Sequence, residues 1–208
     1  MKKENILILA AHPDDGEFGC GASLHKLSRK YEIHYAVFSP CIKSLPIGAK
    51  ETILFEELKN AAKHLNIKIK NIKCFNYPVR EFTSYRQEIL EDMIKLKKSI
   101  KPVQVFMPNS FDIHQDHQVI HNEGKRAFKY NNMLGYELPW NNIECRNNYF
   151  IEISENNLKA KWKAIKEYKS QNFRKYKSFD LFKGLAIVRG SQMNKQYAES
   201  FELIKWSV

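Results

Sequence analysis

The feature of this 208-residue chain that most constrains its fold is a regular alternation of short apolar runs with longer segments of helical period. The short runs predict β-strands, and the first four span residues 5–11, 32–39, 70–77 and 103–108. In the later gaps, apolar side chains recur every three or four residues, as on a helix with one buried face. This alternation predicts an α/β fold: a Rossmann-like, mostly parallel sheet with helices on both faces, arranged as a three-layer sandwich.

The rest of the chain extends this pattern without marking a second domain. A fifth strand is predicted at residues 148–154, followed by another segment of helical period. Residues 40–50 and 130–146 contain Pro, Gly and Asn without a clear period, so we predict loops over one edge of the sheet. Because the sequence has no internal repeat and no linker, we expect residues 1–208 to form one domain.

The formal net charge of +11 raises the question of an acidic partner. Lysine outnumbers arginine by 27 to 7, and the lysines are scattered along the chain. Nucleic-acid binding needs localised positive charge, so we predict no nucleic-acid partner. A scattered basic surface instead favours the attraction of a small anionic substrate.

The spacing of the cysteines and the length of the apolar runs indicate the cellular compartment in which the protein is expected. Cys20, Cys41, Cys74 and Cys145 form no CxxC pair, which predicts neither a disulfide framework nor a thiolate zinc site. The apolar stretch near the N-terminus is too short for a signal peptide, and no run approaches the roughly 20 residues that span a bilayer. We therefore expect a soluble cytoplasmic protein without a membrane partner, whose oligomeric state the sequence does not indicate.

One histidine and three carboxylates follow the first predicted strand: His12, Asp14, Asp15 and Glu17. This is the edge where open α/β sheets bind ligands. A divalent metal of borderline hardness prefers imidazole nitrogen and carboxylate oxygen, which His12 and Asp15 supply, and Asp14 is then left for another role. One aspartate might only cap the following helix, but a cap needs one carboxylate and not two beside a histidine.

A second cluster follows the fourth predicted strand and contains Asp112, His114, Asp116 and His117. Because the carboxyl ends of parallel strands lie at one edge of a sheet, the two clusters can share a metal. Either His114 or His117 would complete a set of two histidines and one aspartate and leave a fourth zinc position for water. His121 has no zincin-type glutamate beside His117, so we predict a surface or packing residue. Three further histidines each stand alone: His25, His34 and His64.

The two motifs resemble those of the LmbE-like or PIG-L family of zinc-dependent de-N-acetylases, in which A-H-P-D-D followed by a glutamate precedes a later H-x-D-H. Here the first motif is residues 11–15 and the second is residues 114–117. Residues 168–171 and 197–201 resemble the weaker carboxy-terminal landmarks of the family. The resemblance therefore covers nearly the whole chain.

The resemblance implies a role for each residue of the two motifs. The implied zinc ligands are His12, Asp15 and His117. Asp14 would be the general base. His114 and Asp116 would face the developing oxyanion, with the Asp116 carboxylate holding a protonated His114. Arg80 resembles a family arginine that lines the substrate pocket, although a salt bridge to Glu81 or to another neighbour would explain it equally well.

Three positions depart from the commonest family pattern. Gly16 separates Asp15 from Glu17, and Gln115 replaces a frequent proline. Asp112 stands where some members carry a tyrosine, so any help to the oxyanion from that tyrosine is missing here. None of these departures removes an implied ligand.

The resemblance implies a zinc-dependent hydrolase that removes an acetyl group from an N-acetylated amino sugar or sugar conjugate. The basic surface favours an anionic example, such as a nucleotide-linked or phosphorylated sugar. A metal-bound carbohydrate- or nucleotide-binding protein without hydrolytic activity is the alternative. A site of two histidines and one carboxylate also suits Fe²⁺ and other divalent ions, so the sequence does not single out Zn²⁺.

Overall fold

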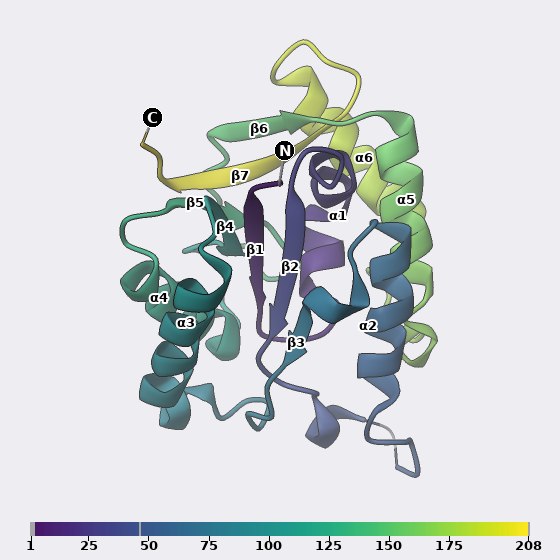
Figure 1. Ribbon diagram of the computed structural model, residues 1–208. Helices are drawn as coiled ribbons and strands as arrows, with labels where there is room; N and C mark the ends of the chain where they lie inside the picture. The colour runs from purple at the N-terminus through teal and green to yellow at the C-terminus, as the bar shows by residue number, and fades with distance from the viewer. Residues whose placement is uncertain (1–2, 46, 208) are drawn as a thin grey trace.

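The computed structural model describes residues 3–45 and 47–207. Within them lies a seven-stranded sheet with α-helices on both faces (Figure 1). The strands are β1 Asn5–Ala10, β2 Glu32–Val37, β3 Ile72–Cys74, β4 Gln104–Pro108, β5 Asn132–Tyr136, β6 Tyr149–Glu152 and β7 Ala198–Lys205. The α-helices are α1 Asp15–Leu27, α2 Ile53–His64, α3 Arg86–Ile100, α4 Gln115–Ala127, α5 Glu155–Lys166 and α6 Phe179–Ser191.

The strand order places a topological switch point beside β1. Across the sheet the order is β3-β2-β1-β4-β5-β7-β6. The first five of these strands pair in parallel, and β7 runs antiparallel to both β5 and β6. The chain winds outward from β1 to β2 and β3, then resumes on the other side of β1 with β4. Open α/β sheets bind ligands beyond the carboxyl ends of the strands at such a point, which lies at the bottom of Figure 1 for β1.

Alternate residues of β1 pack into two separate hydrophobic cores. Ile6 and Ile8 belong to the core that contains residues of α1, α2, α5 and α6. Leu7 and Leu9 belong to the core on the other face, with residues of α3 and α4. Each of these four side chains is fully buried, which stabilises the fold by about 1.5–3 kcal/mol per side chain relative to exposure. The two groups of helices lie on opposite sides of the sheet in Figure 1, so the predicted α/β fold with helices on both faces is confirmed.

Residues 130–146, predicted to be a loop, contain strand β5 instead. The strand has an Asn and a Gly within five residues, which hid it in the sequence pattern. A Cβ at Gly135 would lie 2.8 Å from the Cα of Asn109, so the glycine permits a close approach of the two chain segments. Residues 40–50 form a loop with one turn of 3₁₀ helix, as expected, although Pro46 lies outside the described residues.

Helix α6 and strand β7 were also not predicted from the sequence. Strand β7 was hidden because it buries the charged Glu199 among apolar residues. The Glu199 carboxylate accepts hydrogen bonds from the backbone N–H groups of Ala22 at 3.3 Å and Ser23 at 2.7 Å. It also forms a buried ion pair with Lys161 at 2.7 Å. These N–H groups lie next to Cys20, where α1 departs from helical geometry. Glu199 therefore satisfies backbone donors beside the kink and ties α1 to β7.

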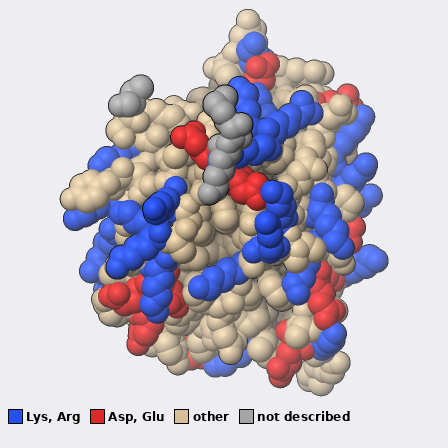
Figure 2. Space-filling model, viewed as in Figure 1, with Lys and Arg blue, Asp and Glu red and all other residues tan. Residues whose placement is uncertain are grey.

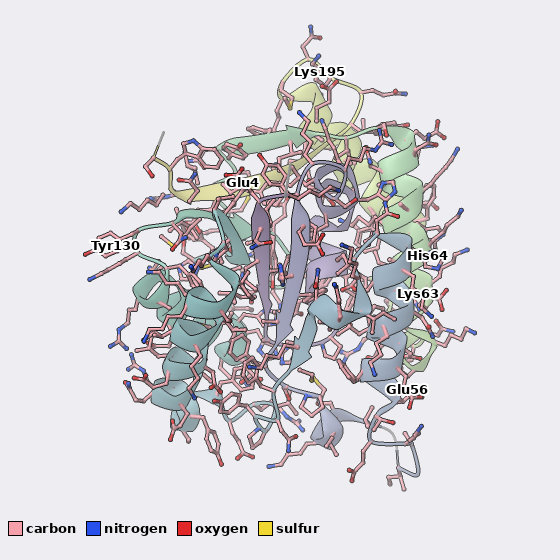
Figure 3. All side chains as sticks on the ribbon, viewed as in Figure 1. Glu4, Glu56, Lys63, His64, Tyr130 and Lys195 are labelled. Atoms are coloured by element: carbon pink, nitrogen blue, oxygen red, sulfur yellow. The ribbon has the colours of Figure 1, made fainter. Side chains whose placement is uncertain are left out.

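Basic side chains are spread over the surface instead of gathered in one patch. Figure 2 shows Lys and Arg side chains across the visible face, with Asp and Glu side chains between them. At the left edge of the same view, Tyr130 projects from the molecule (Figure 3), and three lysine Nζ atoms lie 4.9–5.7 Å from its ring centroid. Among the described residues, no helix has the length and apolarity that crossing a bilayer would require.

Candidate active site

The two clusters of polar residues meet at the carboxyl ends of β1 and β4. His12, Asp14 and Asp15 lie where β1 leads into α1. His114 is the N-cap residue of α4, and His117 lies in the first turn of that helix. Because β1 and β4 are neighbouring parallel strands, both clusters lie at the same sheet edge. The sequence-based expectation that the clusters meet there is thus confirmed.

Three side chains each bring one potential ligand atom to a common point. Nδ1 of His12 lies 3.1 Å from Nε2 of His117. Oδ2 of Asp15 lies 3.3 Å from this Nε2 atom and 3.6 Å from Nδ1 of His12. Ligand atoms about 2.0–2.1 Å from a tetrahedral zinc ion stand roughly 3.3 Å apart. The spacing of the three atoms therefore matches that of three ligands on one metal ion.

His114 lies beside this triangle and provides a second donor set. Its ring centroid is 4.8 Å from that of His12 and 4.6 Å from that of His117. One nitrogen of each ring lies within 4.8 Å of the others, so the three histidines could also gather around a metal. The atoms of the set with Asp15 are closer together, at 3.6 Å or less, and Asp15 is buried. The geometry therefore favours Asp15 over His114 as the third ligand.

A buried carboxylate stands behind each histidine of the triangle. Oδ2 of Asp116 lies 3.1 Å from Nε2 of His12. Oδ2 of Asp112 lies 2.7 Å from Nδ1 of His117. Histidines that bind metals commonly donate their other ring N–H to a carboxylate, which sets the tautomer and the ring orientation. Asp112 had no assigned role in the sequence, although a carboxylate shortly before a ligand histidine is the signal that could have identified it.

The predicted contact between the Asp116 carboxylate and the His114 ring is wrong. Asp116 Oδ2 is shared between His12 and the backbone N–H of Arg80, which donates to it at 2.7 Å. Nδ1 of His114 instead accepts the backbone N–H of Asp116 at 3.2 Å. Burial lowers the pKa of His114 to about 4, and the neighbouring His117 and His12 lower it in the same direction. This pKa favours a neutral His114 at pH 7, whereas a protonated ring had been expected from the sequence.

Asp14 and Asp15 have contrasting electrostatic environments. Asp14 occupies the N-cap position of α1, but its side chain makes no capping hydrogen bond, so helix capping does not explain it. Burial and the adjacent Asp15 charge raise the pKa of Asp14 to about 6. Burial also acts to raise the pKa of Asp15, but the imidazoles of His117 and His12 outweigh it and lower that pKa overall. Asp14 is thus suited to accept a proton near neutral pH.

Two buried tyrosines hold the backbone of the first cluster from inside the protein. The Tyr168 hydroxyl donates a hydrogen bond to the carbonyl oxygen of Pro13. The Tyr35 hydroxyl accepts the backbone N–H of Gly16 at 2.9 Å and donates to Oε2 of Glu17 at 2.7 Å. Burial raises the pKa of Glu17 to about 8, so this carboxyl is mostly protonated at pH 7. Glu17 is therefore a buried support of the turn and lies outside the ligand triangle.

The three residues of the ligand triangle line a cavity of about 310 Å³. The rest of the lining includes Phe18, Arg80, Leu138, Trp140, Arg174 and Tyr176. Arg80 has left-handed backbone geometry, with φ of 72°, and its Nη2 donates to the carbonyl oxygen of Lys43 at 3.1 Å. Glu81, the alternative partner of Arg80, forms an ion pair with Lys43 instead. Arg80 thus lines the cavity with its charge uncompensated by Glu81.

A larger cavity of about 670 Å³ lies at the amino ends of the strands, on the opposite edge of the sheet. Its polar lining groups bind one another: Lys68 pairs with Glu32 at 2.9 Å, and His34 lies 3.2 Å from the Asn5 side chain. These groups do not converge on a common point as the ligand triangle does. We therefore assign the chemistry to the smaller cavity.

The remaining histidines have structural partners. His121 is buried, with Nδ1 2.8 Å from the carbonyl oxygen of Pro108, in keeping with the expected packing role. His64 lies on α2 beside α5 (Figure 3), with Nε2 3.0 Å from Oε1 of Glu167. His25 contacts the amide of Asn157 at 2.9 Å. None of these histidines contributes to the ligand triangle.

Replacing Asp112 by asparagine should weaken the binding of a divalent metal ion about 10–100-fold, because the His117 ring loses the negative charge behind it. A competition titration with a chromophoric chelator would measure this affinity. Asp92→Asn is a matched control, because Asp92 accepts a hydrogen bond from the Tyr77 hydroxyl at 2.7 Å on helix α3, away from the cluster. Unchanged affinity in Asp112→Asn would refute the supporting role of this carboxylate.

An open α/β sheet with imidazoles and carboxylates gathered at its switch point defines a Rossmann-like protein with a candidate metal centre. The model of the PIG-L family, described as GlcNAc-PI de-N-acetylase, matches residues 7–128, which include both clusters. The uncharacterized deacetylase YaiS of Escherichia coli strain K12 is 30% identical over 180 residues, covering 81% of this chain and 92% of that protein. The chain therefore belongs to the PIG-L family of de-N-acetylases, as the two motifs had suggested.

Solved structures of similar fold include two deacetylases. The N,N'-diacetylchitobiose deacetylase of Pyrococcus horikoshii, in complex with an inhibitor, superposes with a TM-score of 0.80 at 22% identity, covering 96% of this chain and 83% of that one. The zinc-inhibited form of the teicoplanin deacetylase Orf2 gives a TM-score of 0.75 at 14% identity, covering 95% and 96% of the two chains. At these identities the likeness shows the fold alone.

Proposed function

We propose that this protein is a zinc-dependent deacetylase that hydrolyses the N-acetyl group of an amino sugar or sugar conjugate. The observation that carries this is the triangle of His12, Asp15 and His117, which line a cavity and whose ligand atoms lie 3.1–3.6 Å apart. Family membership supplies the reaction class. The free cysteines among the described residues support a reducing compartment such as the cytoplasm.

The donor set suits a catalytic zinc ion. Two imidazole nitrogens and one carboxylate oxygen are typical protein ligands of zinc in hydrolases, and three protein ligands leave one position for water or substrate. When bound, zinc supplies Lewis-acid chemistry, which polarises an amide carbonyl and makes water acidic enough to ionise near pH 7. The same donors also accept ferrous iron, so metal analysis of the purified protein has to identify the ion.

The residues around the triangle would handle the proton and the developing charge. Asp14 lines the cavity and has a pKa of about 6, so it would take a proton from the attacking water and later deliver it to the leaving amine. The neutral His114 accepts a hydrogen bond at Nδ1, so its proton resides on Nε2. From there it would donate a hydrogen bond to the oxyanion of the tetrahedral intermediate.

The substrate class follows from the family and from the charge of the protein. The family description names GlcNAc-PI as the compound that is de-N-acetylated, and one neighbouring structure is a deacetylase of N,N'-diacetylchitobiose. The net charge of +11 would attract an anionic example, such as a phosphorylated or nucleotide-linked amino sugar. We therefore place free, phosphorylated and nucleotide-linked N-acetylhexosamines first among the substrates to try.

A screen for acetate release across these sugars, with zinc-loaded protein, tests the proposed function. We expect acetate and a free amine in equal amounts from at least one N-acetylated sugar, and no release after the metal is removed with a chelator. Tight sugar binding without any acetate release would instead favour a metal-bound carbohydrate-binding protein of the same fold.

A further inference from the structure

An aromatic column forms the wall of the cavity around one of its arginines. The rings of Trp140 and Tyr176 stack with centroids 3.9 Å apart and an angle of 9° between their planes. Phe18 supports Trp140 in an edge-to-face contact at 5.2 Å. Cζ of Arg174, an exposed residue, lies 5.0 Å from the ring centroid of Phe173 and 5.9 Å from that of Tyr176. The column joins the loop after β5 to the segment after α5 and places the Tyr176 ring beside Arg174.

The guanidinium of Arg174 has N–H donors that the described residues leave unpaired. Its Nε donates to Oε1 of Gln171 at 3.2 Å, which together with the Tyr176 ring orients the guanidinium plane. Within residues 3–45 and 47–207, its two terminal nitrogens have no hydrogen-bond acceptor, and no carboxylate lies within ion-pair distance. Two other arginines instead pair with carboxylates: Arg189 binds Glu137 at 2.8 Å and Arg86 binds Glu123 at 2.7 Å.

We propose that Arg174 is the specificity-determining residue for an anionic substituent of the substrate, an inference that rests on the proposed function. Its terminal nitrogens would bind two oxygens of a phosphate group carried by the amino sugar, while the acetamido group lies at the ligand triangle. A planar guanidinium that is already oriented by the Gln171 hydrogen bond and by neighbouring rings loses less conformational entropy when it binds an oxyanion in a bidentate manner. The cavity thus has a cationic wall and a metal-binding end, which together select an N-acetylated sugar phosphate.

An alternative role for Arg174 is to stabilise the ionised carboxylate of Asp14 instead of binding the substrate. The positive charge of Arg174 also acts on Asp14, where it is a minor influence that favours the ionised carboxylate. If that were its main purpose, loss of Arg174 would impair every substrate to the same extent. A specificity role instead changes the ratio between anionic and neutral ligands.

Binding to catalytically disabled protein distinguishes the two roles without relying on turnover. Zinc-loaded Asp14→Asn protein would be titrated with N-acetylglucosamine, its 1-phosphate and 6-phosphate, and uridine diphosphate N-acetylglucosamine. We expect Arg174→Ala in this background to weaken binding of a phosphorylated ligand about 10–100-fold more than binding of the neutral sugar. Arg174→Lys, which keeps the charge without the planar fork, should lie in between. Arg29→Ala is the matched control, because it removes an exposed arginine at the other end of α1.

A selective loss of affinity for the sugar monophosphates or for the nucleotide sugar in Arg174→Ala supports the proposed role of Arg174. The ligand that shows the loss identifies whether the phosphate belongs to a sugar phosphate or to a nucleotide sugar. An equal loss for neutral and phosphorylated ligands, no loss at all, or no binding of phosphorylated ligands to the parent protein would overturn the proposed role. If the selective loss occurs but wild-type protein never releases acetate, the proposed hydrolysis fails while the phosphate subsite stands.

Discussion

Replacing His117 by alanine should abolish stoichiometric zinc binding and, with it, acetate release. The change removes the imidazole whose Nε2 lies 3.1 Å from Nδ1 of His12 and 3.3 Å from Oδ2 of Asp15. Two ligand atoms cannot hold the ion as three do, so the affinity should fall by more than the roughly 10–100-fold typical for the loss of a supporting carboxylate. Metal analysis after gel filtration and an assay of acetate release would measure both effects.

His64→Ala is the control for this substitution. His64 is partly exposed on α2 and pairs with Glu167 at the end of α5, outside the cluster. We expect this variant to retain the metal content and the activity of the wild type. A His117→Ala protein that still bound one zinc ion and released acetate at the wild-type rate would show that His117 is not a required ligand of the metal centre.

Replacing Asp14 by asparagine should separate catalysis from metal binding. The side chain keeps its size but loses the carboxylate that would accept the proton of the attacking water. Because Asp14 is outside the triangle of ligand atoms, the variant should bind zinc with the wild-type stoichiometry. The turnover number should fall by about 10²–10⁴-fold, the usual contribution of a general base.

Two measurements on the same preparation decide this prediction. Zinc content equal to the wild type, together with a greatly lowered rate of acetate release, would support the assignment of Asp14 as the base. Activity close to the wild type would refute it. Loss of zinc together with activity would show that Asp14 contributes to the metal centre, which the distances do not indicate.

The sequence predicted the central part of the sheet because local pattern alone determines it. The apolar run of β1 is buried on both faces, which only a strand inside a parallel sheet requires, and the motifs at its end and at the end of β4 follow directly. Parallel pairing then brings His12 and His117 together without any knowledge of side-chain geometry. The meeting of the two motifs was therefore predictable from the order of the strands.

The C-terminal half of the sheet was not predictable, because tertiary contacts override local pattern there. β7 buries Glu199 and Ser200 among its apolar residues, since Lys161 and the backbone of α1 satisfy the Glu199 carboxylate. β5 contains Gly135, a residue type that is typical of turns, but here the absence of a side chain allows the backbone of Asn109 to approach closely. Both strands look polar or irregular until their partners are known.

The partners of the carboxylates also lay beyond the sequence. His114 and Asp116 are two residues apart in the motif, but Asp116 lies on the first turn of α4, where successive side chains point about 100° apart. Its carboxylate consequently faces His12 and the backbone of Arg80. Similarly, the column of Trp140, Tyr176 and Arg174 joins two loops far apart in the chain, and no spacing in the sequence indicates it.

Anomalous diffraction at the zinc absorption edge, from crystals grown with one equivalent of zinc, tests the account most directly. We expect one strong peak within about 2.0–2.2 Å of Nδ1 of His12, Oδ2 of Asp15 and Nε2 of His117. A peak coordinated by His114 in place of Asp15, or no peak between β1 and β4, would contradict the proposed metal centre.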